Sequence, residues 1–195
     1  MPRKKREMSP TGVCHWITRG INRKDIFRHP KDYFFFLDLA RENSKKFDTL
    51  IYHYCLMTNH IHMLICTPSL DRLIQFSQYL KRKYAYYQSK EYKISGATFE
   101  RTYRSKPVDK DVYLLECARY IDRNPLRAGL VNHPRDYPYG SYRIYTEGTQ
   151  SDIITPSPAY LGLANQEYDR RKLYADYVLQ SRPQEEFSSP SSLGL

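Results

Sequence analysis

Two histidines separated by one residue, His60 and His62, are the side chains in this sequence best spaced for shared chemistry. They follow a short Thr58-Asn59 turn that joins two apolar runs. Side chains alternate faces along a strand with a rise of about 3.3 Å per residue, so the two imidazoles point the same way, roughly 6.6 Å apart along the strand. Two such rings can bind one metal ion. An isolated pair also fits two ordinary polar positions on an exposed sheet face.

A predicted helix about sixty residues downstream supplies further reactive side chains. The helix runs from about residue 110 to residue 123, where an Asn-Pro pair ends it. Tyr113, Glu116, Tyr120 and Asn124 form a polar stripe at offsets of three and four residues. Tyr120 and Asn124 are one turn apart and therefore point at the same place.

If this helix lies against the sheet face that carries the histidine pair, Tyr120 meets the ion and Asn124 supplies an oxygen ligand. Two imidazoles and an amide oxygen suit Mg²⁺ or Mn²⁺ better than a closed zinc site. The ion would polarise phosphoryl oxygens and help a phenol of pKa about 10 to act as a nucleophile. A phosphotyrosine diester keeps the energy of the broken strand, which favours strand transfer over hydrolysis. Tyr113, two turns earlier, is the alternative nucleophile.

The composition indicates an acidic polymer or surface as partner. The formal net charge is +10 and the sequence pI is about 9.4, with 19 tyrosines against one tryptophan. Tyrosines beside Lys and Arg can stack on unpaired bases, although some must be core residues. The residues that we predict to contact DNA are Arg19, Asn22, Arg23, Lys81, Arg82, Lys83, Tyr84, Arg101, Arg104, Arg119, Arg123 and Arg127. A solvated basic surface would show the same residues.

The cysteines and the apolar runs indicate where in the cell the protein is expected. The four cysteines contain no C-x-x-C pair, which indicates free thiols in a reducing environment. The sequence has no apolar run of about 18 residues and no signal-peptide pattern. We therefore expect a cytoplasmic protein without a membrane partner.

The pattern of apolar residues predicts an α+β fold. Strands are expected at 12–18, 50–57, 60–66 and within 96–106, and helices at 31–47, 70–89, 110–123 and 167–180, with an irregular stretch at 129–145. This order predicts a ferredoxin-like or RRM-like sandwich, an antiparallel sheet with helices mainly on one face. Residues 1–11 form a basic arm, 12–146 the main domain, 147–181 a linker and C-terminal helix, and 182–195 a disordered tail.

Two stretches carry a family resemblance. Residues 54–64 (YCLMTNHIHML) and 113–130 (YLLECARYIDRNPLRAGL) resemble the one-tyrosine HUH transposases, most of all the REP-associated tyrosine transposases, or RAYT group. Residues 18–20, 22–23, 26–27 and 139–142 fit the same pattern, so the resemblance covers about 12–145. Thr58 replaces the usual Pro, and residues 96–103 depart from the family's segment, which puts DNA contacts there in question. The last fifty or so residues have no usable counterpart.

The resemblance implies a metal-dependent single-strand DNA endonuclease and strand transferase, acting in DNA transposition and recombination at imperfect palindromic hairpins. Tyr120 would become a 5′-phosphotyrosine and release a 3′-OH. His60 and His62 would bind Mg²⁺ or Mn²⁺, with Asn124 as the third ligand. The resemblance allows a monomer or a helix-exchanged dimer, and we favour the monomer.

One rival interpretation stays open. The chain could be a non-catalytic, RRM-like module that binds structured single-stranded nucleic acid, with the histidine pair idle. Basic and aromatic residues fit both an enzyme and a binding module, so only the set of His60, His62, Tyr120 and Asn124 distinguishes the two interpretations. A structural zinc protein is disfavoured because no four Cys and His residues have suitable spacing. His15 and His53, in strand-like runs, are expected to be core or hydrogen-bonded histidines.

Overall fold

The computed structural model describes residues 7–109 and 111–180, so part of the basic arm and the predicted disordered tail at 182–195 lie outside the described residues. The first six major elements follow the order strand, helix, strand, strand, helix, strand. This is the ferredoxin-like order that the apolar pattern predicts, and helices follow it to residue 179.

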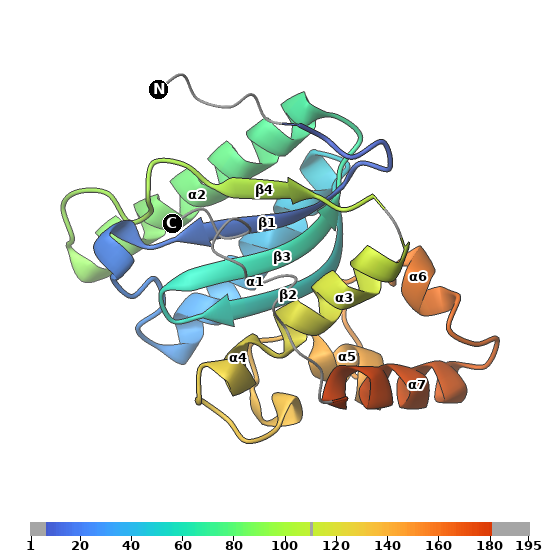
Figure 1. Cartoon of the computed structure of the whole chain (residues 1–195). Coiled ribbons are helices and arrows are strands. Elements are labelled where there is room, and N and C mark those ends of the chain that lie inside the picture. Colours follow the sequence, from blue (N-terminus) through green and yellow to red (C-terminus); the bar gives the residue numbers. More distant parts are fainter. Residues whose placement is uncertain (1–6, 110, 181–195) are drawn as a thin grey trace.

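Four strands form one antiparallel sheet (Figure 1). They are β1 (Val13–Arg19), β2 (Leu50–Met57), β3 (His60–Cys66) and β4 (Arg104–Pro107), in the order β2-β3-β1-β4. β2 and β3 are the predicted hairpin, and β1 lies beside β3 with Ile17 opposite His62 and Arg19 opposite His60. β4 lies at the end of the stretch 96–106 in which a short basic strand was expected, and it extends one residue beyond that stretch. The α+β class and the antiparallel sheet are thus confirmed.

One face of the sheet packs against the two longest helices, α1 (Pro30–Lys46) and α2 (Leu70–Tyr92). The core between them contains Trp16, Ile61, Met63 and Ile65, together with Phe36 of α1 and Phe76 of α2. Because strand side chains alternate, burial of the odd-numbered residues of β3 on this face leaves His60 and His62 on the other face.

The other face is partly covered by the later helices. α3 (Asp111–Asp122) packs on β2 and β3 (Figure 1). It is followed by α4 (Asn124–Arg127), α5 (Tyr142–Glu147), α6 (Pro158–Leu161) and α7 (Glu167–Leu179). Two 3₁₀ turns, η1 (Ile21–Arg23) and η2 (Pro134–Asp136), lie in loops. The stretch 129–145, expected to be irregular, therefore contains η2 and the start of α5.

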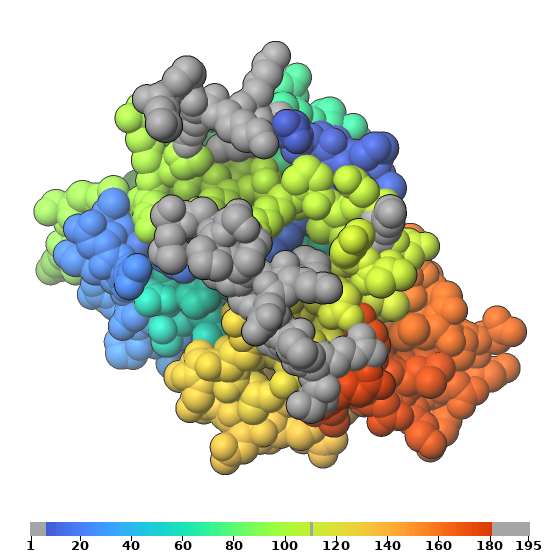
Figure 2. Space-filling view, in the orientation of Figure 1, coloured from blue at the N-terminus to red at the C-terminus, as the bar shows by residue number. Residues whose placement is uncertain are grey.

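The C-terminal helices gather into one lobe beside the sheet, coloured orange to red in Figure 2. A second core joins them to the sheet through Leu64, Ile121, Tyr145, Tyr160 and Tyr174. α3 is thereby held between the sheet and this lobe. Among the helices in the described part of the chain, none combines the length and apolar character that crossing a membrane requires.

Candidate active site

A cavity of about 110 Å³ lies between the β1–β3 face and the C-terminal end of α3. It brings together all four residues that the sequence pattern singles out. Its walls are formed by Ile17, Thr18, Arg19, His60, His62, Glu100, Thr102, Arg104, Lys106, Tyr120 and Asn124.

The two histidines of β3 face each other in this cavity, with ring centroids 4.9 Å apart. His60 Nδ1 lies 2.7 Å from Asn59 Oδ1, an atom that can only accept, so Nδ1 carries the proton. His62 Nδ1 lies 2.9 Å from Nε2 of His15 on β1. In both rings Nδ1 is engaged and Nε2 is the nitrogen left for a ligand.

Burial keeps these rings neutral at pH 7. It lowers the pKa of His60 from 6.5 to about 4, with a smaller contribution from nearby Arg19. Burial also holds the pKa of His62 well below its usual range, and the neighbouring His15 adds to this effect. A neutral imidazole offers a lone pair to a metal without first losing a proton.

Helix α3 positions the tyrosine, and the first residue of α4 supplies the amide. The Tyr120 ring stands edge-on to His15 and to His62, at 5.7 Å between centroids in each case. Asn124 Nδ2 donates to the Tyr120 carbonyl at 2.8 Å, so Oδ1 is the amide atom that can serve a cation. Arg127 lies over the Tyr120 ring, 5.0 Å from its centroid. Tyr113 is 50% exposed and does not line the cavity.

The basic wall of the cavity comes from neighbouring strands. Arg19 and Arg104, both predicted DNA contacts, line it. Lys106 and Thr102 line it as well, and sequence reasoning missed them. Lys106 pairs with His15 across the β1–β4 ladder, so the available signal was strand register. Burial lowers the pKa of Lys106.

The loop after β1 is held against the histidine turn. Ile26 N–H donates to the Thr58 carbonyl at 2.6 Å, and Gly20 N–H donates to the Asn59 carbonyl at 2.9 Å. A Cβ at Gly20 would lie 2.0 Å from the Lys24 carbonyl oxygen, so only glycine fits. Asn22 and Arg23 adopt left-handed backbone conformations and are exposed. These two predicted contacts therefore lie in a loop anchored beside His60.

Three further predicted contacts, Lys81, Arg82 and Arg101, line a separate groove of about 480 Å³ between α2 and residues 97–103. The two hollows share Glu100 and Thr102. Lys83 is exposed and lies 5.5 Å from the centroid of the Tyr79 ring.

Three of the predicted DNA contacts instead have side chains that make hydrogen bonds within the protein. Tyr84 is fully buried and donates to the Ile26 carbonyl at 3.0 Å, so its ring cannot stack on a base. Arg119 is buried, and its guanidinium donates to the carbonyls of Tyr177 and Gln180 at the end of α7. Arg123 donates to the Val178 carbonyl at 2.8 Å. We correct these three assignments: the Tyr84 hydroxyl bonds within the core, and Arg119 and Arg123 bond the end of α7, where cations favourably meet helix C-terminal carbonyls.

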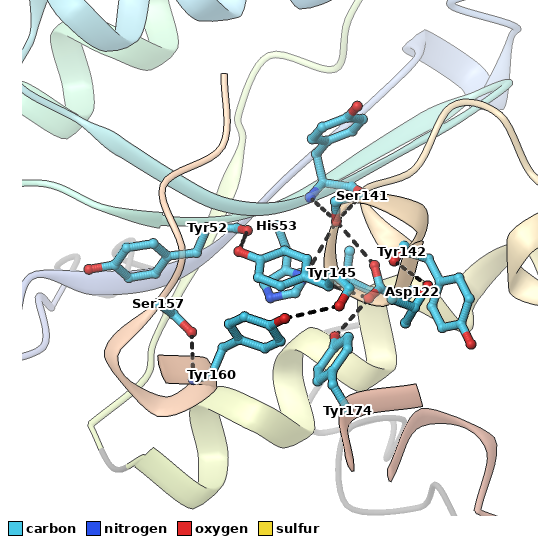
Figure 3. A network of polar contacts seen from close by, with 12 residues as sticks. Tyr52, His53, Asp122, Ser141, Tyr142, Tyr145, Ser157, Tyr160 and Tyr174 are labelled. Atoms are coloured by element: carbon cyan, nitrogen blue, oxygen red, sulfur yellow. Dashed lines mark hydrogen bonds and ion pairs between the residues drawn. The ribbon is translucent and has the colours of Figure 1, made fainter. Parts of the chain in front are cut away.

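A second polar cluster surrounds His53 (Figure 3). Asp122 accepts a hydrogen bond from Tyr174 of α7 at 2.7 Å and lies 3.1 Å from Ser141 Oγ. Its Oδ2 is 3.6 Å from Nδ1 of His53, whose ring stacks on Tyr145 at 4.0 Å between centroids. The relative exposure of His53 and Ser141 is 0%. His53 and His15 are thus buried, hydrogen-bonded histidines, as expected.

The donor atoms that the cavity offers to a cation are imidazole nitrogens and an amide oxygen. Among residues 7–109 and 111–180, no group of three or more His, Cys, Asp or Glu side chains is placed to hold a metal. A metal in the cavity would therefore rely on Nε2 of His60 and His62 and on Oδ1 of Asn124. Two neutral imidazoles and an amide oxygen leave the ion's charge for phosphate oxygens and water.

The chain is similar to known proteins in sequence pattern and in fold. The family model described as "Transposase IS200 like" matches residues 11–124. A solved REP-associated tyrosine transposase bound to a REP hairpin is 13% identical, with a TM-score of 0.60 over 80% of this chain and 93% of that one. A candidate transposase from Deinococcus radiodurans R1 is 16% identical, with a TM-score of 0.43 over 62% of this chain and 96% of that one. No curated protein matches.

Proposed function

We propose, from the premise that this chain belongs to the IS200-like transposase family, that it is a metal-dependent single-strand DNA endonuclease and strand transferase. The resemblance noted in the sequence is confirmed at the level of that family. One observation carries the proposal: a single cavity brings together His60 and His62 of β3, Tyr120 of α3 and Asn124 of α4, although β3 is far from the two helices in the sequence.

Six of the residues that line the cavity have roles in this reaction. Arg19 and Arg104 bind the oxygens of the phosphate that enters. The Tyr120 hydroxyl loses its proton and attacks phosphorus, and the bond from phosphorus to the 3′-oxygen breaks. The products are a 5′-phosphotyrosine and a DNA end whose oxygen gains a proton to give 3′-OH. Attack by that hydroxyl on the phosphotyrosine, or by another 3′-OH, rejoins a strand.

The reaction also requires stabilisation of negative charge, and this is the role of the two histidines and the amide. His60, His62 and Asn124 would hold Mg²⁺ or Mn²⁺, which when bound neutralises negative charge on the phosphoryl oxygens. The neutral state of the two histidines at pH 7 supports this role.

We propose a hairpin-forming single strand as substrate. The solved relative with the 0.60 TM-score is bound to a REP hairpin. In this chain the groove lined by Lys81, Arg82 and Arg101 adjoins the cavity across Glu100 and Thr102 and offers cations to a phosphate backbone.

The test is covalent capture. Labelled single-stranded hairpins from repeats of the host genome are incubated with the protein and Mg²⁺ or Mn²⁺ and separated on a denaturing gel. The wild type is expected to form a protein–DNA adduct that disappears with chelator and in Tyr120→Phe. Tyr113→Phe is the matched control, because its ring is on the same helix but exposed, and it should form the adduct normally.

Two outcomes would contradict the proposal. An adduct that persists in Tyr120→Phe and vanishes in Tyr113→Phe would show that Tyr113, and not Tyr120, is the nucleophile. Tight hairpin binding with no adduct under any metal would leave the rival interpretation, a binding module with an idle histidine pair.

A further inference from the structure

We propose that His15 is a positioning residue that fixes the ring and the tautomer of His62, so that His62 presents Nε2 to the cavity. His15 lies on β1, and its Nε2 is 2.9 Å from His62 Nδ1, with both residues 3% exposed. The inference rests on the metal-binding role proposed above for His62 and adds a residue that neither the sequence motif nor the family match singles out.

The argument begins with the bond between the two rings. Both imidazoles are buried, and burial in a protein interior disfavours a charged ring. Between two neutral rings one nitrogen must donate and the other must accept. If His15 donates, the proton of His62 sits on Nε2 and occupies the lone pair that a metal needs. If His62 Nδ1 donates to His15 Nε2, the lone pair of His62 Nε2 is available.

The neighbouring histidine already shows the second arrangement. His60 Nδ1 lies 2.7 Å from the side-chain oxygen of Asn59, which can only accept, so its Nε2 carries the lone pair. An acceptor on the far nitrogen is the usual way in which proteins orient a metal-binding histidine. For His60 the acceptor comes from the turn, and for His62 it comes from the adjacent strand.

The location of His15 gives a second reason. It sits in the middle of a central strand, where an apolar side chain would avoid the cost of burying a polar ring. Its ring also stands edge-on to Tyr120, with 5.7 Å between centroids and an interplanar angle of 70°. One side chain therefore contacts both a proposed metal ligand and the proposed nucleophile.

The test distinguishes the effect of the hydrogen-bond acceptor on His15 from the effect of the volume of its ring. His15→Gln places an amide oxygen close to the position of the imidazole Nε2 and keeps an acceptor, whereas His15→Leu keeps apolar bulk and removes it. Long-range ¹H–¹⁵N spectra of histidine-labelled, metal-free protein report which nitrogen of His62 carries the proton. Calorimetric titration with Mn²⁺ reports affinity, and thermal unfolding confirms that each variant is folded.

We expect the proton of His62 on Nδ1 in the wild type and in His15→Gln, and on Nε2 or exchanging between both nitrogens in His15→Leu. Mn²⁺ binding should weaken about 10- to 100-fold in His15→Leu and regain most of that loss in His15→Gln. A His62 proton on Nε2 in the wild type would overturn the inference, and so would an unchanged tautomer in His15→Leu. Equal loss of affinity in both variants would reduce His15 to a packing role.

These readouts also distinguish this inference from the function on which it rests. A wild type that binds no Mn²⁺ would refute the proposed metal role. The tautomer of His62 in the metal-free protein would still decide for or against the bond to His15.

Discussion

Two polar clusters beside α3 are built from similar residue types, but only one of them opens onto a cavity. The cavity cluster contains His15, His60, His62, Tyr120 and Asn124, and it opens to a hollow of about 110 Å³. The sealed cluster contains His53, Asp122, Ser141, Tyr145 and Tyr174, and Figure 3 shows its side chains turned toward one another. Each combines histidine with tyrosine and a side-chain oxygen, and both depend on the same helix.

The difference lies in what the polar atoms meet. In the sealed cluster the Asp122 carboxylate meets hydroxyl groups of Tyr174 and Ser141, so its hydrogen bonds stabilise the fold. In the cavity cluster the Nδ1 atoms of His60 and His62 are engaged, and both side chains line the cavity. His53 Nε2 in the sealed cluster lacks a hydrogen-bond partner among the described residues, so the cavity, and not an unpaired ring nitrogen, distinguishes the two clusters. Composition alone would not have separated the two clusters.

The largest effect that we expect in this comparison is on catalysis. His60→Ala should slow adduct formation by about 100- to 1000-fold, equivalent to about 3 to 4 kcal/mol of activation free energy, because a ligand of the charge-stabilising ion is lost. His60 is partly exposed, so the free energy of unfolding should change by less than about 1 kcal/mol. Gel quantification and urea unfolding measure the two quantities. A variant with normal adduct formation would remove His60 from the site.

The sealed cluster should show the reverse behaviour. Asp122→Ala leaves the hydroxyls of Tyr174 and Ser141 without their carboxylate, and we expect the free energy of unfolding to fall by about 2 to 3 kcal/mol. Urea unfolding measures the change. Tyr174→Phe, which removes one of these hydrogen bonds, is the graded control and should lose less. If both variants unfold like the wild type, the cluster does not hold α7 to α3.

Local patterns in the sequence predicted the parts of the site that lie within one element. Alternation placed His60 and His62 on one face of β3, and helical spacing placed Tyr120 and Asn124 one turn apart. Periodicity is a property of neighbouring residues, so it is readable without a structure. The sheet order followed from the order of the elements.

The parts that were missed depend on contacts between distant segments. His15 meets His62 because β1 lies beside β3 in one register, and Lys106 reaches the cavity through the register of β4. Register is set by the packing of the whole sheet. Arg119 was one of the residues predicted to contact DNA. It is buried because α7, 58 residues later, ends against it.

The smallest effect that we expect is a change in pH dependence. The pKa of His60 is lowered from 6.5 to about 4 by burial, so the unfolded chain takes up a proton before the folded one. Stability is then lost as pH falls from about 6.5 to about 4, by up to about 1.4 kcal/mol per pH unit for this residue. Urea unfolding across this range should give a shallower slope for His60→Ala than for the wild type, and parallel lines above pH 7. Equal slopes for the two proteins would mean that His60 titrates alike in the folded and unfolded chain, and that the cavity does not hold it neutral for a metal.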